Sequence, residues 1–170
     1  REVVRIVTPG TNLDTQALDE TKNNYIMCIV YIADRYGVAI ADISTGDYFV
    51  TELPDSSRLM DEIYKFSPSE IICNEAFYMS GMDLDAMRDK LGITIYSLDS
   101  WYFDDAVCKD KLLEHFKVKN FAGLGLADYD CGIISAGALL IYLFETQKNS
   151  LSNLTHITPY ITGKYMLIDS

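Results

Sequence analysis

The sequence of 170 residues has few of the side chains that build zinc sites and disulfides. It has two histidines, His115 and His156, and neither has an acidic or sulfur neighbour at ligand spacing, so no zinc site is predicted. No C-x-x-C pair occurs, and three of the four cysteines lie in apolar runs. This pattern predicts reduced thiols in the core of a cytoplasmic protein. The cysteines are Cys28, Cys73, Cys108 and Cys131.

Basic residues are also scarce, with 14 Lys and Arg against 25 Asp and Glu, for a formal charge of −11. A surface of that sign repels phosphate backbones, so this chain alone is not expected to bind nucleic acid. The longest apolar run, Ile133–Phe144, is shorter than the roughly 20 residues of a membrane-spanning helix. It predicts a buried helix and no membrane association. Because the chain begins at Arg1, without Met, we expect a piece of a longer protein.

Three common catalytic or nucleotide-binding motifs are missing. There is no G-x-x-x-x-G-K-[ST] sequence, and Gly163–Tyr165 does not replace one. The stretch Gly123–Gly125 lacks the third glycine of a dinucleotide loop, and Gly132 and Gly137 flank Ser135 at spacings that do not match a nucleophile elbow. No catalytic residue and no cofactor-binding residue is therefore predicted.

The most ordered pattern in the chain is Tyr25–Leu53, which two turns, Asp34–Arg35 and Ser44–Asp47, divide into three strands. In the first strand, Tyr25–Ala33, both alternating sets of side chains are apolar, which predicts a central strand covered on both faces. Gly46 suits a turn position with positive φ. The other two strands are Val38–Ile43 and Tyr48–Leu53.

Strands and helices are predicted to alternate after Pro54, where Asp55, Ser56 or Ser57 can cap a helix. Three antiparallel strands followed by this alternation predict an α/β fold. It is a mixed five-stranded sheet with helices on its faces, the order found in ribonuclease H-like folds. The later elements are strand Glu70–Cys73, helix Asp83–Leu91 with Gly92 as its C-cap, strand Ile93–Leu98, and helices Tyr102–Phe116 and Cys131–Lys148.

A metal-dependent nuclease on such a fold needs converging carboxylates, one of them inside the first strand. That strand contains none. We expect Asp34 in a turn and Glu62 on the polar face of a helix, so no catalytic or metal ligand is predicted. An active ribonuclease H-like nuclease remains the alternative. The acids available to it are Asp34, Asp42, Glu62, Glu75 and Asp99.

The helix predicted at Tyr102–Phe116 has two faces. Its solvent face is expected to carry mixed charges. At its start, Trp101 and Tyr102 are expected in the core of a strand-to-helix junction, with an exposed aromatic patch as the alternative. The expected solvent-facing residues are Lys109, Asp110, Lys111 and Glu114, and the expected inward ones are Ala106, Leu112, Leu113 and Phe116.

Five stretches, in this order, resemble the MutS family of DNA mismatch-repair ATPases. The resemblance implies a connector domain with a ribonuclease H-like fold and no nuclease activity. It also implies that residues 1–23 arrive from a mismatch-binding domain, that 24–149 form the connector, and that 150–170 begin the core or lever domain. The stretches are Arg5–Thr11, Asp42–Tyr48, Gly123–Leu126, Tyr142–Lys148 and Tyr165–Asp169.

The resemblance also implies what lies outside this chain. A complete MutS protein is a DNA-dependent ATPase that uses ATP and Mg²⁺, binds mismatched duplex DNA and forms a homodimer. This chain has no Walker motif and no F-x-E mismatch wedge, because Phe144 and Glu145 are adjacent. Mismatch reading and ATP hydrolysis are therefore not expected here, and the chain needs no cofactor of its own.

Two further expectations follow from the resemblance. The connector joins the mismatch reader to the core domains and helps to dock the MutL partner, and we place the MutL contact at Lys109, Asp110, Lys111 and Glu114. As a rigid body it transmits nucleotide-driven movement through hinges. We expect these hinges at Asn12–Asn24 and Asn149–Thr155.

Overall fold

Three antiparallel strands begin the computed structural model, which describes residues 24–147 and 151–160. They are β1 (Ile26–Ile32), β2 (Arg35–Asp42) and β3 (Asp47–Leu53). Alternate residues of β1 point to opposite faces of the sheet, and both sets are fully buried at its centre. This confirms that β1 is a central strand covered on both sides. The expected incoming segment, residues 1–23, lies outside the described residues.

The two hairpin turns differ in how well the sequence located them. Gly46 has φ +83°, as predicted, and it closes the turn between β2 and β3. The first turn is centred on Ala33 and Asp34, with φ values of 53° and 63°, and not on Asp34 and Arg35. A two-residue turn with positive φ at both positions matches the twist of the flanking strands. The prediction was one residue late because alanine is not a residue expected there.

The sheet continues with parallel strands on both sides of the hairpins. β4 (Glu70–Cys73) pairs with β1, and β5 (Thr94–Ser97) pairs with β4. On the far side, β6 (Thr158–Pro159) pairs with β3, and the strand order is β5-β4-β1-β2-β3-β6. The predicted ribonuclease H-like mixed sheet is therefore confirmed, with six strands in the described residues instead of five. The added strand comes from a segment that was expected to leave the domain.

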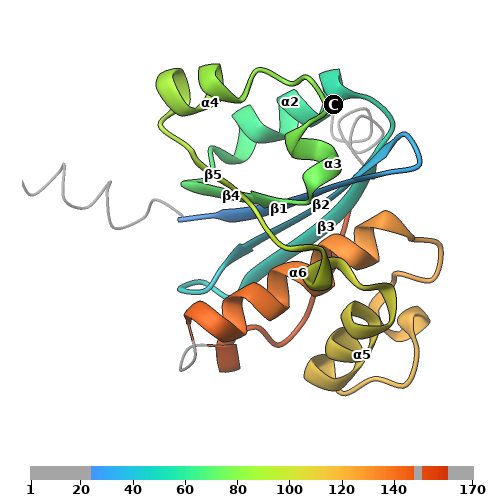
Figure 1. Ribbon diagram of the computed structural model, residues 1–170. Helices are drawn as coiled ribbons and strands as arrows, with labels where there is room; N and C mark the ends of the chain where they lie inside the picture. The colour runs from blue at the N-terminus through green and yellow to red at the C-terminus, as the bar shows by residue number, and fades with distance from the viewer. Residues whose placement is uncertain (1–23, 148–150, 161–170) are drawn as a thin grey trace, which may run out of the picture.

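Three helices cover one face of the sheet, the upper face in Figure 1. They are α2 (Ser56–Phe66), α3 (Glu75–Tyr78) and α4 (Leu84–Leu91). Asp55 caps α2 and Gly92 ends α4, as predicted, whereas α3 was not predicted. Tyr64 and Leu91, both large apolar side chains of these helices, are 59% and 39% exposed. Side chains buried on this face include Met27, Ile29, Val38, Leu59, Ile63, Ile71 and Phe77.

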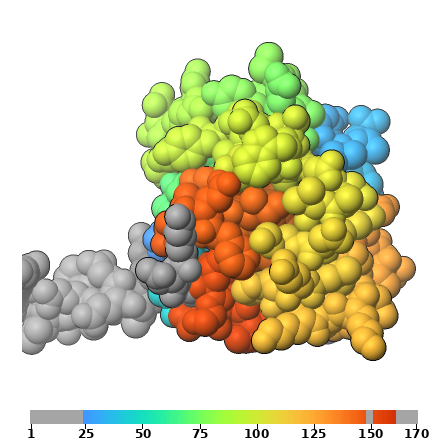
Figure 2. All heavy atoms as spheres, turned by 60° about the horizontal axis from the view of Figure 1, so that its bottom comes forward, coloured from blue at the N-terminus to red at the C-terminus, as the bar shows by residue number. Residues whose placement is uncertain are grey.

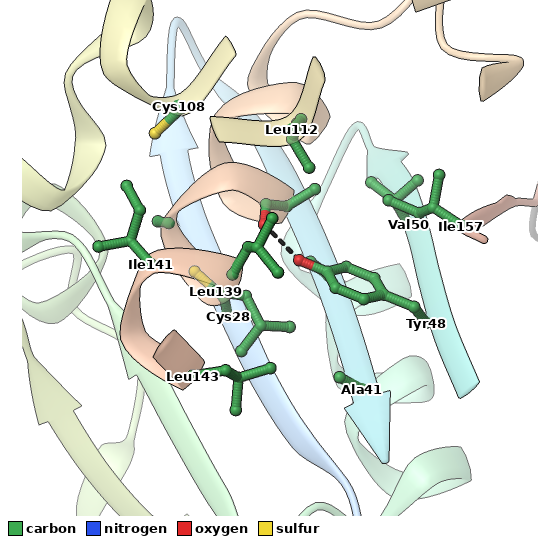
Figure 3. Packing of buried hydrophobic residues seen from close by; sticks show 14 of the residues in the cluster. Cys28, Ala41, Tyr48, Val50, Cys108, Leu112, Leu139, Ile141, Leu143 and Ile157 are labelled. Atoms are coloured by element: carbon green, nitrogen blue, oxygen red, sulfur yellow. Dashed lines mark hydrogen bonds between the residues drawn. The ribbon is translucent and has the colours of Figure 1, made fainter. Parts of the chain in front are cut away.

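Two longer helices, α5 (Asp105–Phe116) and α6 (Cys131–Thr146), cover the other face (Figure 1). α6 is a buried helix, as predicted, and the Tyr48 hydroxyl of β3 donates a 2.5 Å hydrogen bond to its Ala136 carbonyl (Figure 3). α5 begins later than predicted, because Ser100–Phe103 forms the 3₁₀-helix η2 and Asp104 caps α5. The short 3₁₀-helices η3 (Phe121–Leu124) and η4 (Leu151–Asn153) complete this layer.

Two glycines set how closely α6 approaches its neighbours. A Cβ on Gly37 of β2 would lie 2.2 Å from the Cys131 carbonyl oxygen of α6. A Cβ on Gly137 of α6 would lie 2.4 Å from the Cβ of Cys108 in α5. Real Cβ atoms do not approach other atoms so closely, so glycine is required at both places. Cys108, not the exposed Ala106, is thus the inward residue in the first turns of α5.

The four cysteines are buried and none is in a disulfide, as predicted. Burial raises the pKa of the thiols of Cys73, Cys108 and Cys131 to about 12, and that of Cys28 well above its usual value. Within 24–147 and 151–160, no helix is both long enough and apolar enough to cross a membrane.

Candidate functional site

Buried polar side chains gather where the described chain begins and ends. Four polar or charged residues are buried in the described part, and three of them bind one of its ends. The fourth, Ser135, donates to the Gly132 carbonyl within α6. The three that hold the ends are Asp42, Thr51 and Glu62.

The N-terminal anchor is the carboxylate of Asp42, at the end of β2, which is 1% exposed. One of its oxygens accepts a 3.0 Å hydrogen bond from the backbone N–H of Asn24, immediately before β1. The other accepts from the backbone N–H and the hydroxyl of Ser44, at 3.0 and 2.7 Å. A buried carboxylate is costly unless such donors surround it. Asp42 therefore fixes both the point where the chain joins the sheet and the turn that follows β2.

The C-terminal anchor surrounds Tyr160. Its backbone N–H donates to the Val50 carbonyl at 3.0 Å, and its carbonyl accepts from the Thr51 hydroxyl at 2.7 Å. The Tyr160 phenol donates to the Glu62 carboxylate of α2 at 2.8 Å. Burial, followed by the charge of Glu62, raises the pKa of this phenol. Glu62 is 5% exposed, so its predicted place on the polar face of a helix was wrong.

The segment before Tyr160 is part of the same core. The His115 Nε2 atom lies 2.8 Å from the Leu154 carbonyl oxygen, which ties the segment to α5. His115 is half-buried and His156 is exposed. The expectation that the chain leaves the domain at residue 150 was therefore wrong for residues 151–160, and 161–170 lie outside the described residues. The buried side chains of residues 151–160 are Leu151, Leu154 and Ile157.

The acids that a nuclease would need are spread over the domain. Asp42 and Glu62 serve the two anchors, while Asp34 is exposed in the first turn and accepts from the Tyr31 hydroxyl at 3.2 Å. Glu75 lies in the first turn of α3, and Asp99 precedes η2. Among the described residues, no three His, Cys, Asp or Glu side chains could hold one metal ion.

The carboxyl ends of parallel strands commonly form binding crevices, and β4 and β5 end beside a hollow of about 520 Å³. The Asn74 side chain on its wall accepts from the backbone N–H groups of Tyr31 and Phe77, both at 3.1 Å, and donates to the Tyr31 carbonyl. Asn74 thus joins β1 to α3. Of the acids, only Glu75 and Asp99 line this hollow.

The four residues proposed for MutL contact do not form one surface on α5. Lys109 pairs with Asp105 at 3.1 Å, and the Lys111 ammonium lies 4.4 Å from the centre of the Phe144 ring of α6. Asp110 and Glu114 are exposed, one helical turn apart. The structure thus places two acids together on the solvent face, while Lys111 packs against α6.

The aromatic pair Trp101 and Tyr102 differs from its expected place in the core. Trp101 is 51% exposed, and its ring stacks on that of Tyr102 with centroids 4.0 Å apart. The alternative of an exposed aromatic patch is therefore correct. Sequence reasoning did not connect this pair to Tyr96 of β5, which is 48% exposed.

Comparisons with known proteins place these features in a family. The family model described as MutS domain II matches residues 24–158. The DNA mismatch repair protein MutS of Lachnoclostridium phytofermentans is 53% identical over 170 residues, which is all of this chain and 18% of the relative. That of Dehalococcoides mccartyi strain 195 is 38% identical over 100% of this chain and 19% of the relative.

Among solved structures, Thermus thermophilus RuvC in complex with a Holliday junction substrate matches 75% of this chain and 98% of its own, with a TM-score of 0.48 and 14% identity. The chain spans about a fifth of the length of the MutS relatives it matches. The match to the family model covers both β-hairpins and most of the segment that packs after α6. The chain therefore belongs to the MutS domain II family.

Proposed function

We propose that this chain is the non-catalytic connector domain of a MutS-type mismatch-repair ATPase. It couples mismatch recognition to the core and ATPase domains and helps to dock MutL. On this proposal ATP, Mg²⁺, mismatched duplex DNA and the homodimer contact belong to other parts of the MutS protein. The observation that carries the proposal is the pair of anchors at Asn24 and Tyr160.

The anchors make the domain suitable for transmitting movement. The described chain enters the sheet immediately before β1, which pairs with β4. It ends after β6, which pairs with the middle of β3. Both points are bonded to buried side chains of the sheet or of α2. A force applied at one end therefore moves the whole core, because packed interiors deform little.

The MutL part of the proposal is supported by the solvent face of α5. Asp110 and Glu114 are exposed one turn apart. α5 is held rigidly by the close approach at Gly137 and by the Lys111–Phe144 contact. A pair of carboxylates on a fixed helix suits a basic partner surface, and opposite charges favour fast and specific association.

Coupling is tested in the full-length MutS protein that carries this domain. Tyr160→Phe removes the hydroxyl that binds Glu62, and Tyr64→Phe removes an exposed hydroxyl from the same helix as a control. We expect Tyr160→Phe to reduce the stimulation of ADP release by mismatched DNA about fivefold, with basal ATPase activity unchanged. Asp42→Asn, which alters the N-terminal anchor, is tested in the same way. Stimulation of ADP release that is equal in wild type and in both variants would contradict a coupling role.

Docking is tested by reversing charges. The Asp110→Lys, Glu114→Lys double variant should weaken MutL recruitment to mismatch-bound MutS about tenfold in surface plasmon resonance. The control, Asp61→Lys with Asp89→Lys, reverses two exposed acids on α2 and α4, on the opposite face of the sheet. Recruitment that is unchanged in the first variant, or equally weakened in both, would remove α5 from the docking surface.

A further inference from the structure

A group of exposed and half-buried aromatic side chains lies beside the edge strand β5 and is not used by the anchors or by α5. We call it the aromatic ledge and define it by Tyr96, Trp101, Tyr102 and Tyr142. In Figure 2 it belongs to the region where the yellow-green segment around β5 and η2 meets the orange-red α6. Tyr96 pairs with Ile72 of β4, which faces α6, so Tyr96 projects on the same side of the sheet as α6.

Stacking and hydrogen bonds fix the positions of rings in the ledge. Trp101 stacks on Tyr102 with an interplanar angle of 24°, which leaves one face of the indole open to solvent. Tyr142 of α6 lies close enough to Tyr96 and Tyr102 for their phenols to raise its pKa, after burial and the hydrogen bond to Glu70. Tryptophan is usually well buried, so a half-exposed, pre-stacked indole is an unusual surface feature.

Two carboxylates border these rings. The Tyr102 hydroxyl donates to Glu145 of α6, and the Tyr142 hydroxyl donates to Glu70 of β4. The bond to Glu145 raises the pKa of Tyr102 to about 12. Each carboxylate has acceptor sites beyond the one that its tyrosine uses. No ion pair within 24–147 and 151–160 involves Glu70 or Glu145.

Elsewhere in the domain, four aromatic rings have a cation of the same chain over them. Lys65 lies over Phe66 and Tyr160, Arg88 over Tyr78, and Lys111 over Phe144. Tryptophan offers the most favourable ring for such a contact. Yet in the described part of the chain no Lys or Arg lies over Trp101 or the three tyrosines of the ledge.

We propose that the aromatic ledge binds an arginine side chain presented by a separate protein. A guanidinium can stack on the open face of Trp101, and the carboxylate of Glu145, which is bonded to the neighbouring Tyr102, adds an opposite charge to the same surface. Arginine fits better than lysine because its planar, always charged group stacks on an aromatic face. The formal charge of −11 favours a basic partner and disfavours a nucleic acid.

The position of the ledge favours a separate protein over another part of the same chain. β5 is one edge of the sheet and β6 is the opposite edge, with four strands between them. The described chain ends next to β6, at Tyr160. The last described residue therefore lies at the opposite edge of the sheet from the ledge.

Trp101 is the only tryptophan of the chain, so its fluorescence reports on the ledge alone. The probes are the capped peptide Gly-Gly-Arg-Gly-Arg-Gly-Gly and its citrulline counterpart, in which neutral ureas replace the guanidinium groups. In the 170-residue chain we expect a saturable change in emission with the arginine peptide, and about tenfold weaker binding of the citrulline peptide. Equal binding of both peptides, or no saturable change, would overturn the proposal.

Variants locate the binding. With a dye-labelled arginine peptide, Trp101→Ala should weaken binding about tenfold and Glu145→Gln about threefold, while Tyr64→Ala and Asp61→Asn leave it unchanged. Both controls replace exposed residues away from the ledge. If Trp101→Ala does not fold, judged by circular dichroism, Glu145→Gln decides. Wild-type affinity in Glu145→Gln would contradict the proposed site.

Two further experiments distinguish other possible occupants of the ledge. Single-stranded DNA that shifts Trp101 emission, where the arginine peptide does not, would make the ledge a nucleic-acid platform and refute the proposal. The last arm rests on the proposed function and uses the full-length MutS protein. Peptide binding there should equal binding to the 170-residue chain; its loss would mean that the same polypeptide covers the ledge, which overturns a separate partner but not the connector role.

Discussion

The Tyr160 hydroxyl donates a hydrogen bond of 2.8 Å to the Glu62 carboxylate, which lies 98 residues earlier in the chain. The bond joins the last described residue to the middle of α2. Glu62 also has the Lys65 ammonium at 4.0 Å, and that ammonium lies over the Tyr160 ring at 5.4 Å. These three side chains hold the end of the described chain against α2.

Removing the hydroxyl should cost more than a surface substitution. In Tyr160→Phe the buried Glu62 loses its donor, and a buried polar group without its partner costs about 1–3 kcal/mol. We expect that fall in the free energy of unfolding of the 170-residue chain, measured by urea denaturation. Tyr64→Phe, at an exposed position, should change it by less than about 0.5 kcal/mol. A Tyr160→Phe variant as stable as wild type would show that the bond is not important.

This anchor could not have been found from sequence. Local patterns located β1, β4, Gly46 and Gly92, because strand alternation and positive-φ turns depend on neighbouring residues. Glu62 was placed on a polar face because its partner is distant in sequence and helical periodicity does not reveal tertiary hydrogen bonds. The nearest available signal was the aromatic Tyr160 directly after Pro159.

The predictions for residues 151–160 and for Trp101 were wrong for a related reason. Residues 151–160 contain too short a pattern to predict a strand, and β6 exists only because β3 offers a free edge. Trp101 was expected in the core because large aromatic residues are usually buried. Its exposure results from η2, which ends the strand-to-helix junction before α5 begins at Asp105.

The contact between β2 and α6 predicts a strong effect of a single methyl group. In Gly37→Ala the new Cβ would meet the Cys131 carbonyl oxygen at 2.2 Å and its carbon at 2.4 Å, both backbone atoms. The helix must shift, so we expect a loss of about 3 kcal/mol or more in urea denaturation. Gly123→Ala is the matched control, because its nearest neighbour, the Val118 Cγ1 atom, is 3.5 Å away. Similar losses in both variants would contradict close packing at Gly37.

Buried thiols predict a particular pH dependence. Burial raises the pKa of the Cys73, Cys108 and Cys131 thiols to about 12, whereas a thiol in the unfolded chain has a pKa of about 8.5. At pH 8 an aromatic disulfide reagent should therefore modify the native chain at least about a hundredfold more slowly than the chain in guanidinium chloride. Equal rates in the two states would show that the thiols are accessible.

The same shift affects stability, with a definite sign. The folded chain keeps its thiol protons where the unfolded chain loses them, so the stabilising contribution is complete below about pH 8.5 and is lost as the pH rises toward 12. Each buried thiol then lowers the free energy of unfolding by at most about 1.4 kcal/mol per pH unit. Denaturation curves at pH 8, 9 and 10 should show this fall, and a smaller one in Cys131→Ala. Stability that rises over this interval would contradict the assignment.

The remaining prediction concerns catalysis, which the nuclease alternative requires. The 170-residue chain should leave single-stranded DNA, duplex DNA and an RNA–DNA hybrid intact in the presence of Mg²⁺ or Mn²⁺. The reason is geometric: two-metal cleavage needs several carboxylates around ions about 4 Å apart, and in the described residues Asp42 and Glu62 are bonded within separate anchors. Asp42→Asn and Glu75→Gln chains serve as controls for contaminating nuclease, because contaminant activity is the same in every preparation. Metal-dependent cleavage that is present in wild type and lost in either variant would mean that the carboxylates act together, and the connector proposal would then have to give way to a nuclease.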